Sequence, residues 1–261
     1  MWSPNDSTEV AFLPIYLVLG CVAAVCAVRH GLRGALGHIS LVIFCVVRFV
    51  GNLLLLIAAH TSDDVKGLVI AGFIMQGLGY SFLITAMLSY FSHLIRDMDR
   101  AEAEPAEKEG GKRTRIERIL NLVNIVALVL LIVGFNESMD SISTSSGALN
   151  MQDLNVMVKV GNILYLALTM LLAVIAFVHI RRINTPRQKV LLYTMISALP
   201  FMVVRCVYTV YVTFQGNPRH GSLAARIVCQ YVMEVIVLIV LGVSGLLLPR
   251  PGAPHANPFT P

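Results

Sequence analysis

Three ionisable residues lie inside long apolar stretches of this sequence: Arg48, Arg205 and Glu234. An ionised side chain at the centre of a bilayer costs about 2.5–3.5 kcal/mol even on the more lenient insertion scales. If these stretches cross a membrane, the three charges are expected to pair with one another or to contact a polar ligand. They can therefore form a cluster that only fixes helix packing, or the centre of a binding site.

Further polar side chains lie in the apolar stretches, several of them one helical turn from these charges. They are Asn52, Gln76, Tyr80, Tyr208 and Gln230. Counted along the apolar stretches, Asn52, Gln76 and Gln230 lie in the same half of the membrane as Arg205 and Glu234, and Arg48 lies near its midplane. We therefore predict an interior polar pocket that opens toward one side, with Arg48, Arg205 and these five residues as candidates for substrate binding.

Two carboxylates are candidate catalytic acids, Glu234 first and Glu9 second. A buried, neutral carboxylic acid could protonate a lipophilic substrate in a site that excludes water. A neighbouring arginine would instead favour the ionised carboxylate and make Glu234 a poor proton donor. In that case Glu9 or Asp63, at the mouth of the pocket, would be the acid.

Several other chemistries have no support in the sequence. Asp63-Asp64 lacks the third carboxylate of a DDxxD motif, so metal-assisted ionisation of a diphosphate is not expected. The seven histidines lie at the ends of apolar stretches or between them, and no HxxxH pair occurs. We expect no metal, no cofactor and no bound nucleic acid. The net charge of +5 is better explained by basic membrane-facing loops.

The elements that must position these residues are membrane-spanning helices. The chain has 261 residues, of which 56% are hydrophobic and 13% charged, and its mean hydropathy is +0.75. Soluble domains carry about 25% charged residues. We predict an all-α membrane protein, a bundle of seven transmembrane helices at residues 10–28, 36–58, 67–95, 119–135, 156–180, 190–214 and 227–248. Residues 1–9 form a short lumenal N-terminus, 10–248 one membrane domain, and 249–261 a disordered, proline-rich cytoplasmic tail.

Basic residues predict the orientation. Fourteen of the 20 Lys and Arg residues fall in one set of loops and three in the other, which places the N-terminus outside or in a lumen and the C-terminus in the cytoplasm. The sequons at Asn5 and Asn136 fall on the predicted lumenal side and are candidate glycosylation sites. We expect the endoplasmic reticulum as the compartment. The five cysteines all lie in apolar stretches and are expected to be reduced.

Two stretches carry a resemblance to a known family. Residues 40–51, SLVIFCVVRFVG, and 197–208, SALPFMVVRCVY, resemble a family of fungal seven-helix integral membrane proteins, as do Glu9 ahead of an apolar run and Glu234 within Val-Met-Glu-Val-Ile-Val. The resemblance covers about residues 9–249. Its characterised members are associated with the membrane-bound terpene cyclases of ascofuranone- and macrophorin-type meroterpenoid pathways.

This resemblance implies a metal-independent isomerase of fungal secondary metabolism. Such a cyclase protonates a terminal epoxide or alkene of a prenylated substrate, and aromatic faces stabilise the cations that follow. Its partners would be a lipophilic prenylated molecule, the bilayer and other membrane enzymes of the pathway. The alternatives are a heptahelical receptor or sensor, a transporter, and a non-catalytic scaffold, because seven spans alone do not determine function.

Overall fold

The computed structural model describes residues 4–30, 36–61, 66–101, 110–144, 156–180, 186–215 and 223–247, and within these ranges it is entirely helical. The helices are α1 Pro4–His30, α2 Leu36–His60, α3 Lys66–Ala101, α4 Gly110–Thr144, α5 Val156–His179, α6 Pro186–Gln215, α7 Leu223–Arg226, η3 Ile227–Val232 and α8 Met233–Leu247. Seven spans are long and apolar enough to cross a membrane, because α7, η3 and α8 form one continuous span. The predicted class, an all-α bundle with seven candidate transmembrane helices, is confirmed.

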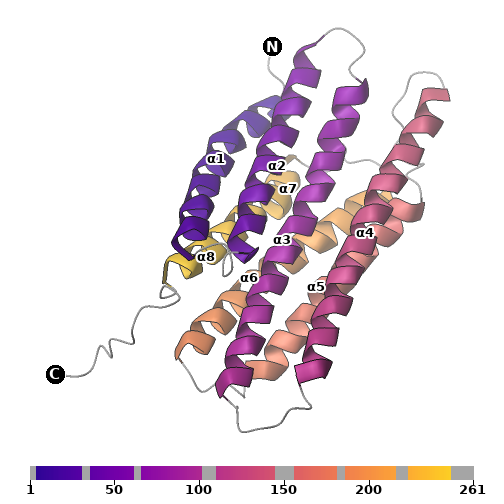
Figure 1. The fold of residues 1–261 in the computed structure, drawn as a ribbon. Helices are drawn as coiled ribbons and strands as arrows, with labels where there is room; N and C mark the ends of the chain where they lie inside the picture. The colour runs from indigo at the N-terminus through magenta and orange to yellow at the C-terminus, as the bar shows by residue number, and fades with distance from the viewer. Residues whose placement is uncertain are drawn as a thin grey trace.

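The seven spans form a closed ring in chain order. Each of α1 to α6 packs against the next, α8 packs against α6, and α8 also contacts α1. The two ends of the membrane domain are therefore neighbours, as Figure 1 shows for α1 in indigo and α8 in yellow. Across the ring α3 also contacts α6. Of the seven spans α3 is the most buried, which makes it the central helix.

Glycines allow α2 and α3 to approach closely. A Cβ added at Gly51 would lie 3.1 Å from the Met75 Cβ, and one added at Gly72 would lie 2.7 Å from Leu55. Small residues of this kind are common where membrane helices pack without a hydrophobic driving force between them. The same interface contains Arg48, since a Cβ at Gly79 would lie 3.3 Å from the Arg48 Nε.

Several helices continue beyond the predicted spans. The largest difference is in α4, which covers 110–144 where the sequence predicts a span at 119–135 between two loops. Hydropathy marks where the apolar residues end, whereas a helix can extend into the polar region beside the bilayer. Asn136 consequently lies on the exposed surface of α4 and not in a loop, and Asn5 lies in the first turn of α1.

The cysteines agree with the prediction that they are reduced. All five are free, with Cys26, Cys45 and Cys206 buried in the bundle, Cys229 partly buried and Cys21 exposed on its surface. Residues 4–9 of the predicted N-terminal segment belong to α1, whereas residues 1–3, the predicted tail at 249–261 and Asp63 lie outside the described residues.

Candidate functional site: a buried ion cluster

Glu234 is the hub of a fully buried ion cluster. Its Oε1 accepts from the Arg48 Nη2 of α2 and the Arg205 Nε of α6, and its Oε2 accepts from the Tyr16 hydroxyl of α1 at 2.9 Å. Glu234, Arg48 and Tyr16 are completely inaccessible, and Arg205 is 5% exposed. We call Tyr16, Arg48, Arg205 and Glu234 the ion cluster. It joins four spans that are far apart in the sequence.

The π-helical turn η3 lies directly before Glu234. In a π-helix one extra residue enters the turn, so the side chains that follow are rotated relative to an α-helix, and such turns occur frequently at functional sites. Here the π turn begins after Arg226 and ends at Val232, two residues before Glu234. The π turn therefore changes the direction in which the Tyr231 and Glu234 side chains leave the helix axis. Counting 3.6 residues per turn along the whole span does not give these directions.

The ion cluster contains more positive than negative charge. Among the described residues, Glu234 is the carboxylate that contacts Arg48 and Arg205, so two guanidinium groups face one carboxylate. Arg205 also donates from Nη1 to the Thr209 hydroxyl at 3.0 Å. The Nε and Nη1 of Arg48 have no hydrogen-bond partner among the described residues. A buried charge with free donors is costly unless something else pairs with it.

Two amide side chains beside Arg48 are also unpartnered within the described part of the chain. Both side-chain polar atoms of Asn52 lack a protein partner, although Asn52 is fully buried one turn from Arg48. Gln76 on α3 accepts from the Gln230 Nε2 at 3.4 Å, but its own Nε2 donates to no described atom. Buried polar groups are nearly always hydrogen-bonded in native proteins. The concentration of unpartnered donors at one level of the bundle therefore calls for an explanation.

Aromatic rings surround the arginines. The Arg205 guanidinium carbon lies 4.6 Å from the centre of the Tyr80 ring, and that of Arg48 lies 5.6 Å from the Phe44 ring. The Tyr80 hydroxyl lies 3.1 Å from the Thr169 hydroxyl and accepts from the Cys206 thiol at 2.8 Å. These rings supply cation–π contacts that partly compensate for the lost hydration of the guanidinium groups.

A second ion pair lies between the ion cluster and the end of the bundle where α1 begins. The Arg226 Nη2 approaches the Glu9 Oε1 at 3.4 Å and the Tyr231 hydroxyl at 3.5 Å. Next to this ion pair, Phe12 stacks on Tyr231 with ring centres 4.7 Å apart. Glu9 is therefore near the predicted mouth of the site, but it is paired and 7% exposed.

The structure brings together most of the residues that the sequence selects. Arg48, Arg205 and Glu234 are in direct contact, and Tyr80 lies under Arg205. Asn52, Gln76 and Gln230 lie at the same level. By helix rise, these three residues are about 10–15 Å from the end of the bundle where α1 begins. Tyr208 is half-buried, and its electrostatic neighbours are Arg226, Cys229 and Tyr211.

Two expectations about chemistry are affected by this geometry. Glu234 accepts three hydrogen bonds, two of them from arginines, and this arrangement stabilises the ionised carboxylate. It is therefore poorly suited to be the first-ranked proton donor. Glu9 is also ion-paired, and Asp63 lies outside the described residues.

Sequence reasoning missed Tyr16 and Phe12 as parts of the site. Tyr16 provides the third hydrogen bond to Glu234, and Phe12 covers Tyr231. A helical count offers a signal, because Glu9, Phe12 and Tyr16 are spaced by three and four residues and share one face of α1. Nothing in the sequence showed that this face meets α8.

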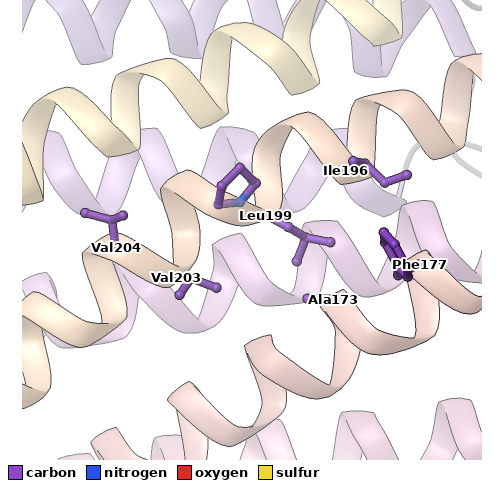
Figure 2. A pocket seen from close by; sticks show the side chains of 7 residues that line it. Ala173, Phe177, Ile196, Leu199, Val203 and Val204 are labelled. Carbon is purple, nitrogen blue, oxygen red and sulfur yellow. The ribbon is translucent and has the colours of Figure 1, made fainter.

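A hollow of about 410 Å³ lies elsewhere, between α5 and α6 (Figure 2). Its lining is apolar, and it is next to Pro200, inside α6. The lining residues are Ala173, Phe177, Ile196, Leu199, Pro200, Val203 and Val204. None of the predicted site residues lines it, so this hollow is not the polar pocket that the sequence predicts.

Within the described residues, no group of three or more His, Cys, Asp or Glu side chains is placed to hold a metal ion. The fold and the ion cluster together define a polytopic helical membrane protein with a buried polar centre. The chain belongs to a family described as a domain of unknown function, DUF7702, whose model matches residues 3–251. No curated protein and no solved structure matches the chain.

Proposed function

We propose that this protein binds a lipophilic small molecule inside the bundle, with the polar head of the molecule at the ion cluster. The observation that carries the proposal is the set of buried, unpartnered polar atoms on Arg48, Asn52 and Gln76. A cluster that serves packing alone gains nothing from such atoms, because each one costs about 1–3 kcal/mol when left unsatisfied. A ligand that enters from the bilayer would satisfy them.

Photolabelling tests this proposal. Membranes that contain the full chain would be irradiated with photoreactive farnesyl phenol and, separately, with a photoreactive C16 alcohol, and labelled peptides would be identified by mass spectrometry. We expect saturable labelling of peptides from α2, α3 or α8 with at least one probe, and competition by the same compound without the photoreactive group. Labelling that is unsaturable and confined to the outer faces of the helices would contradict the proposal.

A second candidate function is metal-independent terpene cyclisation, which the family resemblance implies. The aromatic rings of Phe44 and Tyr80 beside the two arginines, and of Tyr165 against Tyr80, favour it, since such rings can stabilise carbocations. Against it, both buried carboxylates in the described residues, Glu9 and Glu234, are ion-paired. The geometry therefore supports binding better than protonation, and a cyclase would need one of these pairs to open when substrate binds.

The cyclase candidate has a direct assay. Microsomes that contain the chain would be given farnesylated phenols and their terminal epoxides in EDTA. A cyclase yields a product of unchanged mass and altered retention time, and Glu9→Gln should abolish it if the mouth carboxylate is the acid. Membranes with Asn124→Leu serve as the control, because Asn124 bonds to Ser81 and Thr85 away from the ion cluster. Saturable labelling without any isomer would favour the receptor or scaffold alternatives.

A further inference from the structure

The ion cluster has an unbalanced positive charge on one side. Glu234 uses Oε1 for Nη2 of Arg48 and for Arg205, and Oε2 for Tyr16, so its acceptor sites are occupied. The Nε and Nη1 of Arg48 have no partner among the described residues. Arg48 is fully buried, so water does not reach it from the surface of the bundle.

The unpartnered neighbours of these Arg48 donors are amides, which supply two further donors and one acceptor, the Asn52 Oδ1. The interface between α2 and α3 brings these residues together. Arg48 of α2 lies opposite Gly79 of α3, and Gly51 of α2 lies opposite Met75 and Gly72 of α3. Asn52 and Gln76 are the next residues along each helix after Gly51 and Met75, so they lie beside Arg48 in the same interface. The free Nδ2 of Asn52 and the free Nε2 of Gln76 are both amide donors. The α3 backbone at Gly79 packs against Arg48, since a Cβ added there would lie 3.3 Å from the Arg48 Nε, so any side chain at this position would crowd that nitrogen.

We propose that the unpartnered donors of Arg48, with Asn52 and Gln76, bind the anionic head of an amphiphile, a carboxylate or a phosphate. The inference rests on the proposed function and names the chemistry of its ligand. One negative charge would balance the two guanidinium groups, and its oxygens would accept from donors that are otherwise unpaired. A neutral hydroxyl or ester would satisfy some donors and leave the charge uncompensated.

Probes with the same tail and different heads test whether binding depends on the negative charge of the head. The full chain in phosphatidylcholine nanodiscs would be labelled with photoreactive hexadecanoate, its methyl ester and the corresponding alcohol. We expect half-maximal labelling by the carboxylate at a concentration at least about tenfold lower than by either neutral probe, on peptides of α2 and α3. Equal labelling by all three would overturn the anionic assignment while leaving the proposed function intact, and the absence of saturable labelling by any probe would overturn both.

Changing the lipid composition of the nanodiscs tests whether the anionic head belongs to a phospholipid or to a free amphiphile. In nanodiscs that contain phosphatidate, a bound phospholipid phosphate would compete with photoreactive hexadecanoate, and labelling would fall. Unchanged labelling would identify a free amphiphilic carboxylate as the ligand. Both results retain the anionic head, because the comparison with the neutral probes has already tested the charge.

Two pairs of variants separate binding from folding. Asn52→Leu removes an amide that has no protein partner, so we expect unchanged or higher thermal stability and at least about tenfold loss of the preference for the carboxylate. Asn124→Leu removes an amide bonded to Ser81 and Thr85, and should lower stability while keeping the preference.

Gly79→Ala should weaken carboxylate labelling, whereas Gly77→Ala, whose Cβ would meet only ordinary contacts, should not. If Asn52→Leu weakened all three probes equally, the unpartnered donors of Arg48 and Asn52 would not be the anion site.

Discussion

At the scale of single residues, Glu234 determines how two arginines can be buried in an apolar bundle. It accepts from Arg48, Arg205 and Tyr16, which come from three other spans. Breaking one member of a buried ion pair is more destabilising than exchanging the whole pair for apolar residues, because it leaves an uncompensated charge. The ion cluster therefore has a structural role in addition to any ligand that it binds.

Substitution of Glu234 tests this structural role. Glu234→Gln leaves both arginines without a negative partner, and we expect the purified protein to lose about 3–5 kcal/mol of stability. Tyr16→Phe removes one hydrogen bond to a charged group and should cost about 1.5–3 kcal/mol. Thermal unfolding in detergent measures both. Equal, small effects of the two variants would contradict the assignment of Glu234 as the hub.

At the scale of the elements, close helix approaches determine the positions of the polar side chains. Gly51 and Gly72 bring α2 against α3, and Gly134 brings α4 against α5, where an added Cβ would lie 2.8 Å from the Val158 backbone nitrogen. A backbone atom cannot be moved aside by a rotamer change. The interfaces are therefore sensitive to a single methyl group.

A glycine pair tests this sensitivity. Gly134→Ala should destabilise the bundle by about 1–3 kcal/mol, because α4 must move away from Val158. Gly67→Ala, where an added Cβ meets nothing within 4 Å, should be neutral or stabilising by up to about 1 kcal/mol, since alanine is the better helix former. Thermal unfolding of the two variants in the same detergent gives the comparison. A stable Gly134→Ala variant would mean that this interface is more adaptable than its geometry indicates.

At the scale of the whole molecule, the ring of seven spans places the ion cluster between α1, α2, α6 and α8 and nearer the end of the bundle where α1 begins. The fold does not state which end faces the cytoplasm. The excess of Lys and Arg in one set of loops predicts that the N-terminal end is lumenal.

Protease protection tests the orientation. In sealed microsomes, a tag at the C-terminus should be digested by added protease, whereas a tag at the N-terminus should be protected until detergent is added. The physical reason is that basic segments are retained on the cytoplasmic side during insertion. The reverse pattern would place the mouth near Glu9 on the cytoplasmic side and would contradict the predicted orientation.

The sequence by itself determined the seven spans and the identity of the charged residues inside them. Runs of about 20 apolar residues can satisfy their backbone in a membrane only as helices, and the cost of burying charge marks Arg48, Arg205 and Glu234 as unusual wherever they lie. The approximate depth of each residue also follows from the sequence, because it depends on the helix rise alone.

Only the tertiary structure decided which partners meet. The rotation of each helix about its axis is set by packing against its neighbours, and the π turn before Glu234 changes that rotation locally. For this reason the sequence could not show that Tyr16 of α1 would bond to Glu234, that Tyr208 would lie toward Arg226, or that two nitrogens of Arg48 would have no partner among the described residues. The pairing of Glu234, the predicted proton donor, with two arginines follows from contacts between spans that lie far apart in the chain.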